Sequence, residues 1–402
     1  MRFTFPRIQR GNAYFAANVL GARGALLTAL VYFFEDGRWS SPVKLGVEEH
    51  RLTAEDQLFI LMQAGLYLSS TRGTPESRNC YERAEPLCHS LNRPVLLYSA
   101  LMGQWRYSYI ADKLSAALGV ARRVHSLAIE QNNSAVMIGA CQALVSTLYY
   151  LGEFETARQY AMRGVQIWRS GGVQYNAEDL DAPAVVCLCY EALCRWHLGE
   201  VPLCHQIMEE AISLAKELNE TNSLAVALHF AAFLARYERN PAEVERLASD
   251  LIELSTAQNF AFWLACGEVS RGWARSASGD TDQGIASIDD GIRDYRATGS
   301  ILITPCWLVL KAEALHLANR TSEALAAIAE AEAVAQRTEE RESFAELHRL
   351  RGVFLANMCG DEVQIETSFC EAIRIAKKQK SVSLATRAEA SYAEYRARKL
   401  KH

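Results

Sequence analysis

The sequence lacks any long run of charges of one sign. Its 402 residues include 42 lysines and arginines against 47 aspartates and glutamates, so the formal net charge is only −5. Attraction to nucleic acid or to an acidic membrane depends on a concentrated basic surface. We therefore expect neither nucleic acid nor a membrane as a partner. Half of the residues are apolar, which is enough to bury the large core of a globular protein.

The motifs of phosphate and disulfide chemistry are also missing. There is no GxxxxGK[ST] loop, in which backbone amides and a lysine surround the phosphates of a nucleotide. Eleven cysteines are present, but they are scattered within apolar helical runs such as VVCLCYEALC, residues 185–194, without the spacing of a disulfide scaffold. We expect reduced thiols in the core of a cytoplasmic protein.

One group of possible metal ligands comprises four cysteines and two histidines. They are Cys187, Cys189, Cys194, Cys204, His197 and His205. Cys187 and Cys194 share a helical face, but Cys189 points away from that face, and zinc sites usually pair cysteines as CxxC in a tight turn. We therefore interpret these cysteines as buried thiols, and expect no metal and no cofactor.

Candidates for catalysis are few. Cys266 or Ser270 could serve as a nucleophile beside His229, and paired carboxylates occur at residues 289–290 and 339–340. Adjacent residues on a helix diverge by about 100°, so such pairs do not converge on one substrate atom. We expect no catalytic residues, and we expect that the protein is not an enzyme.

Residues 1–47 differ in character from the rest of the chain. An apolar stretch over residues 13–34 loosely imitates a signal sequence, but Gly21, Arg23 and Gly24 interrupt it and no small-residue cleavage site follows. The segment FFEDGRWSSPVKL then predicts a short hairpin around an Asp-Gly turn. We expect a folded but irregular segment here, not an exported or anchored one.

From about Leu52 onward, helix breakers recur at a nearly constant interval. Gly152, Gly199, Asn240, Gly279, Asn319 and Gly360 are separated by 47, 41, 39, 40 and 41 residues. Each breaker stands between two amphipathic runs, as where CYEALCRWHL precedes Gly199 and CHQIMEEAISLAKEL follows it. The repeating unit is therefore predicted to be a helical hairpin.

Small residues recur at a fixed distance from the breakers, as close packing of two helices requires. Twelve residues after five of the breakers come Gly164, Ala211, Gly291, Ala331 and Ala372. A single hairpin buries too little apolar surface to be stable, so the hairpins must stack. We predict an all-α superhelix over residues 48–400, with about eight hairpins and a C-terminal capping helix. The hairpins are expected near residues 52–91, 94–131, 134–170, 183–218, 221–258, 261–297, 301–336 and 341–379, and the capping helix at 382–399.

These offsets resemble those of the tetratricopeptide repeat (TPR), with a period near 40 in place of the usual ~34 residues. Segments such as LVSTLYYLGEFETAR (144–158) and GWARSASGDTDQGI (272–285) resemble the TPR tail of bacterial signalling proteins. In those proteins a class III adenylate or guanylate cyclase and an AAA-type ATPase precede the tail. The resemblance implies a TPR-like superhelix in a bacterial signalling or regulatory system. It does not extend to the phosphate loop, which this sequence lacks, or to the first 47 residues.

The resemblance also implies a concave groove lined by the first helix of each hairpin. Carried over by distance from the breakers, the groove positions are Tyr149, Tyr150, Trp196, His197, Trp273, Glu313 and His316. This row is aromatic and nearly neutral, so it suits an apolar peptide or an amphipathic helix. For each ring the other interpretation is core between repeats, because buried aromatics dominate helical cores.

The sequence therefore predicts a non-catalytic TPR module for protein binding or scaffolding. Two alternatives stay open. One is a small-molecule-sensing regulatory subunit of a separate ATPase, cyclase or transcription factor. The other is a truncated remnant of a cyclase–ATPase–TPR protein.

Overall fold

The computed structural model describes residues 53–71, 75–171 and 182–400, and this part of the chain forms seventeen helices and no strand. The predicted irregular segment 1–47, with its hairpin, lies outside the described residues. In chain order the helices are α2 (Ala54–Thr71), α3 (Pro75–Ser90), α4 (Pro94–Ala111), α5 (Leu114–Gln131), α6 (Ser134–Tyr150), α7 (Phe154–Arg169), α8 (Pro183–His197), α9 (Val201–Glu217), α10 (Thr221–Tyr237), α11 (Pro241–Gln258), α12 (Ala261–Ala277), α13 (Thr281–Ala297), α14 (Thr304–Leu317), α15 (Thr321–Thr338), α16 (Phe344–Asn357), α17 (Glu362–Lys378) and α18 (Val382–Lys399).

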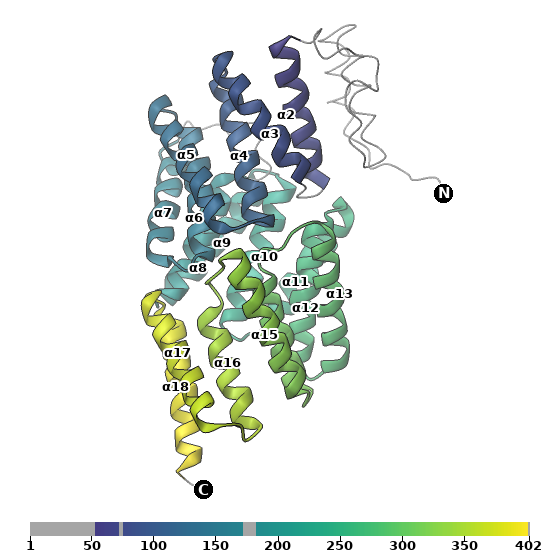
Figure 1. The fold of residues 1–402 in the computed structure, drawn as a ribbon, viewed down its shortest axis with the longest axis vertical. Helices are drawn as coiled ribbons and strands as arrows, with labels where there is room; N and C mark the ends of the chain where they lie inside the picture. The colour runs from purple at the N-terminus through teal and green to yellow at the C-terminus, as the bar shows by residue number, and fades with distance from the viewer. Residues whose placement is uncertain (1–52, 72–74, 172–181, 401–402) are drawn as a thin grey trace, which may run out of the picture.

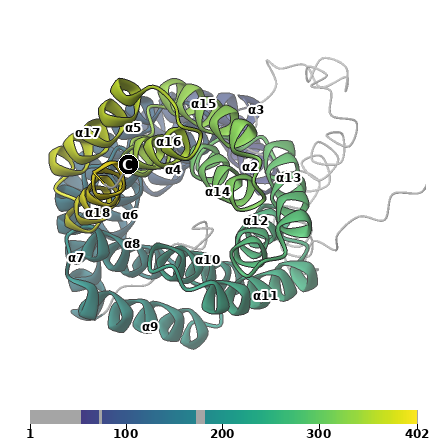
Figure 2. The ribbon, with the colours of Figure 1, turned by 90° about the horizontal axis from the view of Figure 1, so that it is seen from below.

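The helices pair into eight successive hairpins, and α18 packs against the last of them, so the predicted all-α superhelix is confirmed (Figure 1). Viewed along the axis, the first helices of the hairpins, from α8 to α16, form an inner ring. The second helices, from α9 to α17, form an outer ring (Figure 2). No helix among the described residues is both long and apolar enough to cross a membrane.

A residue with a left-handed backbone follows almost every helix and sets the repeat length. From α8 to α16 these residues come at intervals of 20, which makes each helix plus its turn one module and each hairpin 40 residues. They are Gly199, Asn219, Arg239, Asn259, Gly279, Gly299, Asn319, Glu339 and Cys359. Glycine and asparagine adopt this conformation at little cost, so their spacing explains the period seen in the sequence.

All six predicted breakers lie between helices, but two of the left-handed residues stand one position before the predicted breaker. The left-handed positions are Arg239 (φ 59°) and Cys359 (φ 51°), not Asn240 and Gly360. Asn240 instead caps the next helix, where its side chain accepts a hydrogen bond from the backbone N–H of Glu243 at 3.2 Å. A left-handed arginine costs roughly 1–2 kcal/mol, so Arg239 must be held in place by other contacts.

The hairpin seams are closest where glycines face each other, as predicted from the sequence. Between α12 and α13, a Cβ atom on Gly284 would lie 2.6 Å from the carbonyl oxygen of Gly272, and one on Gly291 would lie 3.0 Å from that of Ala265. Both distances are shorter than a carbon and an oxygen tolerate. Larger side chains at these positions would therefore force the two helices apart.

Turns in the C-terminal half contact the N-terminal half along the axis of the superhelix. The backbone N–H of Ile301, after α13, donates to the carbonyl of Ile110 in α4 at 2.8 Å. The N–H of Arg341, after α15, donates to the carbonyl of Tyr150 in α6 at 2.7 Å. These contacts show that the second turn of the superhelix stacks on the first, and we call this stacking the closure.

Helix α18 completes the closure by packing against α8, and its Arg387 reaches the end of α10. Ser381 Oγ lies 2.9 Å from His197 Nδ1, and the guanidinium of Arg387 donates to the carbonyl of Tyr237. The last helix was predicted to be a solvated cap. It does cover the last hairpin, but its first half is also a contact between distant repeats.

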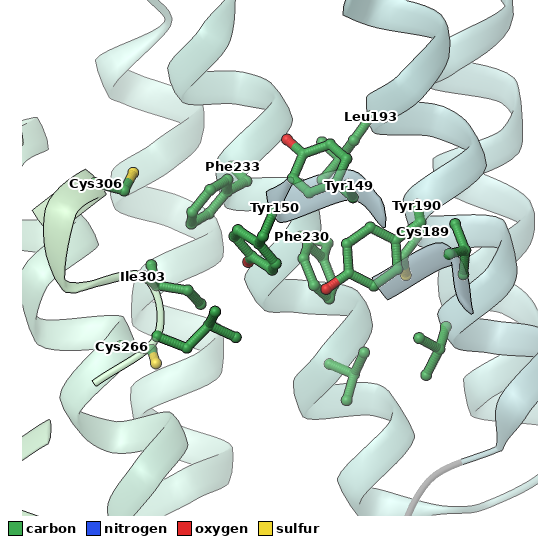
Figure 3. Close-up of a cluster of buried hydrophobic side chains, with 14 of the residues drawn as sticks. Tyr149, Tyr150, Cys189, Tyr190, Leu193, Phe230, Phe233, Cys266, Ile303 and Cys306 are labelled. Carbon is green, nitrogen blue, oxygen red and sulfur yellow. The ribbon is translucent and has the colours of Figure 1, made fainter. Parts of the chain in front are cut away.

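Aromatic side chains fill the interior where α6, α8 and α10 meet (Figure 3). The ring centroid of Tyr149 lies 5.2 Å from that of Tyr150 and 5.1 Å from that of Tyr190, which in turn lies 4.7 Å from Phe230. Pairs at such distances add about 0.5–1.5 kcal/mol each beyond the area they bury. The interior of the superhelix between α6, α8 and α10 is therefore filled by side chains.

The cysteines are free thiols, as expected, but not all belong to the core. Nine of the eleven are buried, while Cys359 and Cys370 are exposed. Cys359 occupies the turn between α16 and α17, and Cys370 lies on α17. The sequence prediction of core thiols is therefore wrong for these two positions.

We predict that Gly284→Ala destabilises the protein by about 1–3 kcal/mol, because the added methyl group would overlap the backbone of α12. Gly119, an exposed residue of α5 with no atom within 4 Å of its potential Cβ, is the matched control. Gly119→Ala should stabilise by about 0.5–1 kcal/mol. Urea unfolding measures both changes, and equal effects at the two positions would contradict the close seam.

Candidate functional site

The predicted groove residues lie mostly below the surface. Tyr149, Tyr150 and His197 are 0% exposed, Trp273 is 2% and Trp196 is 4% exposed. Of the two interpretations that the sequence left open for these side chains, their burial favours core between repeats. Glu313 and His316 are partly exposed.

Two of these buried residues, Tyr149 and His197, join one polar chain, and Trp196 packs beside it. The hydroxyl of Tyr149 lies 2.6 Å from that of Tyr237 and 3.4 Å from His197 Nε2, and the Tyr237 hydroxyl donates to the carboxylate of Glu342. The ring of Trp196 stacks on that of Tyr237 at 4.4 Å. Burial lowers the pKa of His197 well below its ordinary value, and Arg387 and Arg236 add to this effect. His197 therefore serves as a neutral hydrogen-bonding group.

A second chain joins two more of the predicted residues. Trp273 Nε1 donates to Glu313 Oε2 at 2.8 Å, and Arg239 Nη1 donates to the same oxygen at 2.6 Å. The other terminal nitrogen of Arg239 donates to Glu346 Oε1 at 2.7 Å. These two ion pairs hold Arg239 in its left-handed conformation. They also carry the chain from α12 to α16.

Both chains end at one cavity, which we call the axial cavity. It lies between α10, α14, α16 and α18. The centre of a water molecule could occupy about 20 Å³ of its space. This is room for one or two water molecules. Its lining residues are Arg236, Tyr237, Arg239, Val309, Leu310, Glu313, Glu342, Ser343, Glu346, Leu384 and Arg387. Of the predicted residues, Glu313 lines it directly.

Glu346 interacts with three arginines at or beside the axial cavity. Besides Arg239, it accepts from Arg349 at 2.7 Å and lies 3.6 Å from Arg387 Nη1. Burial raises the pKa of Glu346, but Arg349, Arg387 and Arg239 outweigh burial and bring it below the ordinary value. Glu346 is thus ionised and shared by three arginines.

The remaining arginine of the axial cavity is differently placed. The guanidinium of Arg236 lies over the rings of Phe233, at 4.4 Å, and Tyr237, at 4.8 Å. Its Nε and Nη2 atoms are buried, with no hydrogen-bond partner among the described residues. A buried guanidinium without its hydrogen bonds is costly.

Two lining residues of the axial cavity, Arg236 and Tyr237, could have been found from the repeat pattern. The predicted positions Tyr149 and Trp196 stand three residues before their left-handed glycines. The same offset from Arg239 gives Arg236, and one residue further gives Tyr237. The sequence prediction assigned no groove position to this hairpin and therefore missed both.

Two predicted residues do not join the axial cavity. The hydroxyl of Tyr150 has no partner among the residues that the structure describes, while its carbonyl holds the turn at Arg341. His316 bonds to Thr321 and Asn357 and packs on Phe354, outside the cavity lining.

The catalytic candidates are not assembled in the structure. Ser270 donates to the carbonyl of Cys266 at 3.0 Å, and the His229 ring is enclosed by aromatic rings without a hydrogen-bond partner in the described part of the chain. Burial lowers the pKa of His229 to about 3. Asp289 and Asp290 pair with different cations, Lys311 and Arg293. No three metal-ligating side chains come together within residues 53–71, 75–171 and 182–400.

Glu340 lies within the turn that reaches the axis. Its carboxyl group accepts from the backbone N–H of Ile303 at 2.9 Å and from Thr338 Oγ1 at 2.9 Å. Burial raises the pKa of Glu340 to about 8, and the nearby Glu342 adds to the rise. The carboxyl group is therefore protonated in the folded protein at neutral pH.

No protein-family model matches the chain. A curated relative, an uncharacterized protein of Rhizobium meliloti (strain 1021), is 20% identical over 280 residues. The match covers 68% of this chain and 27% of the relative, so the chain spans about a quarter of that protein's length.

Three solved structures share the fold. A Rap protein in complex with competence and sporulation factor has a TM-score of 0.63, with 13% identity over 92% of this chain and 94% of its own. NprR in complex with its cognate peptide NprX has a TM-score of 0.50, with 12% identity over 84% and 97% of the two chains. A human IFIT1 dimer with m7Gppp-AAAA has a TM-score of 0.51, with 13% identity over 97% and 80%. These likenesses establish a TPR-like helical repeat fold.

We predict that the buried Glu340 carboxyl makes stability fall as pH rises. Its pKa is near 4.3 in an unfolded chain and about 8 in the folded protein. The folded state therefore binds the extra proton, and this contribution declines from about pH 4.5 until the folded carboxyl also ionises, near pH 8. Thermal unfolding of Glu340→Gln should show a smaller decline between pH 5 and 9 than wild type does.

Glu339→Gln is the control for that experiment. A hydrogen bond from the backbone N–H of Ser115 lowers the pKa of Glu339, so its carboxylate contributes no loss of stability at alkaline pH. An unchanged decline in Glu340→Gln, or an equal change in Glu339→Gln, would contradict the burial of a protonated carboxyl.

Proposed function

We propose that this protein is a non-catalytic regulatory module that binds a protein or peptide segment at the inner face of its superhelix. The observation that carries the proposal is the axial cavity, where α10, α14, α16 and α18 present charged side chains. Such groups are expensive to hold together inside a protein. A binding role gives a reason for keeping them.

The fold supports this proposal. Two of the solved structures with the same fold are complexes, one with competence and sporulation factor and one with a cognate peptide. A superhelix built from hairpins offers a continuous inner surface for an extended segment. We place the protein in the cytoplasm of a bacterial signalling or regulatory system. The absence of a nucleic-acid partner stays a prediction.

The chemistry of the partner needs revision. An apolar peptide or an amphipathic helix was expected because the predicted groove was aromatic, but those rings are buried. The groups that line the axial cavity are mainly arginines and glutamates. We therefore propose a segment that meets the cavity with a polar or charged group.

The second candidate function is a sensor of a small molecule that controls a separate ATPase, cyclase or transcription factor. The small size of the axial cavity favours it, because 20 Å³ admits only a small group. The greater length of the Rhizobium relative supports a kinship with repeat regions of larger proteins. Whether this chain is related to the tail of cyclase–ATPase fusions stays a prediction.

Comparative co-purification tests the proposal. Tagged wild-type protein is recovered from its source cells beside two variants, Arg239→Gln in the axial cavity and Arg293→Gln on the exposed face of α13. A defined partner should be retained by Arg293→Gln. Its recovery on Arg239→Gln should fall by roughly tenfold or more, because loss of a charged hydrogen bond costs about 1.5–3 kcal/mol.

Circular dichroism must first show that both variants keep the helical content of wild type. Equal recovery of the partner on all three proteins would contradict a site at the axial cavity. Turnover of a nucleotide by the purified chain would contradict a non-catalytic module.

A further inference from the structure

Arg236 is a cation whose hydrogen-bonding capacity the protein leaves unused. Its Nε and Nη2 atoms are buried and have no partner among the described residues, and its side chain lines the axial cavity. The aromatic faces of Phe233 and Tyr237 stabilise its charge but accept no such hydrogen bond. These two N–H donors of Arg236 therefore lack a hydrogen-bond acceptor, which a group entering the cavity would supply.

The carboxylates of the axial cavity are already engaged elsewhere. Glu313 accepts from Arg239 and Trp273, and Glu346 accepts from Arg239 and Arg349. Glu342 accepts from the hydroxyl of Tyr237. Burial raises the pKa of Glu342.

Positive charge consequently exceeds negative charge at this place. Arg236, Arg239, Arg349 and Arg387 stand at or beside the cavity, against the three carboxyl groups of Glu313, Glu342 and Glu346. The pKa of Arg387 is lowered by burial, and the neighbouring Arg239 and Arg349 contribute to the lowering. The surplus favours an anionic occupant.

The dimensions of the axial cavity limit that occupant to a small planar group. About 20 Å³ is room for one or two oxygen-sized atoms. The way in lies beside Arg239, whose side chain is 39% exposed, and Arg387, at 22%. A phosphate is larger and carries more charge, so the nearby glutamates would repel it more strongly than a carboxylate.

We propose that the axial cavity binds a carboxylate, toward which the guanidinium of Arg236 turns so that its buried, unpartnered Nε and Nη2 donate two hydrogen bonds, while Arg387 adds positive charge. Arginine and carboxylate match in geometry, since parallel N–H groups meet parallel oxygens. The carboxylate comes from a peptide, as its C-terminus or an acidic side chain, or from a small organic acid. In the first case the inference rests on the proposed function and names the group that the partner inserts.

Thermal unfolding at constant ionic strength tests the carboxylate site. The full chain is titrated with sodium acetate, sodium chloride and inorganic phosphate. Acetate should raise the midpoint of wild type in a saturable way, above the effect of chloride. Arg236→Gln should weaken the apparent affinity for acetate by roughly ten- to hundredfold, whereas Arg246→Gln, on the exposed face of α11, should not.

Two further probes separate the sources of the carboxylate. N-acetyl-triglycine with a free C-terminus is compared with its C-terminal amide. Tighter binding of the acid than of both amide and acetate identifies a peptide carboxylate, while equal binding of acetate and the peptide acid identifies a small organic acid. Arg236→Lys, which keeps the charge but loses the paired geometry, should recover only part of the affinity.

The proposal is overturned if acetate acts no more strongly than chloride, if phosphate binds more tightly than acetate, or if Arg236→Gln leaves the acetate effect unchanged. Its failure is distinguishable from failure of the proposed function. A partner that co-purifies equally with wild type and Arg236→Gln would refute a peptide carboxylate at this site and leave the protein-binding role standing. An acetate effect without any partner would refute the protein-binding role alone.

Discussion

A left-handed residue after almost every described helix is the constraint on which the rest of this structure depends. It stops each helix at nearly the same length, so that from α8 to α16 the chain advances in equal modules of 20 residues. Equal modules stack with the same geometry at every step, and a constant rotation per hairpin produces a regular superhelix. Helices of variable length would give an irregular stack whose ends need not meet.

Because the stack is regular, its C-terminal end returns to the N-terminal half. The turn at Arg341 then reaches the carbonyl of Tyr150, and α18 reaches α8 and α10. The axial cavity is a product of that return, since Arg387 of α18 meets Tyr237 of α10 across 150 positions of sequence. The closure and the axial cavity therefore form together, and detaching α18 would disrupt both.

The sequence predicted the parts of this structure that depend on local patterns. The hairpins follow from apolar periodicity and from glycine or asparagine at the turns, and the facing glycines of α12 and α13 follow from fixed offsets. The prediction failed at Arg239, which adopts a left-handed backbone conformation that is unfavourable for arginine. The ion pairs that Arg239 makes there with Glu313 and Glu346 cannot be read from the local sequence pattern. No groove position was assigned to this hairpin, so Arg236 and Tyr237 were missed.

The axial cavity was out of reach for a second reason, because its members come together only after closure. Its charges are also unevenly paired, which is visible only in three dimensions. The central claim is therefore the closure itself, and zero-length carbodiimide cross-linking of the dilute protein tests it most directly. Lys380 and Glu155, both exposed and 225 positions apart, form an ion pair across the closure, whereas Lys377 and Glu389 form a local pair at 2.8 Å. The account predicts that mass spectrometry of the digest recovers both cross-links within one chain. Recovery of the local cross-link without the one between Lys380 and Glu155 would contradict it.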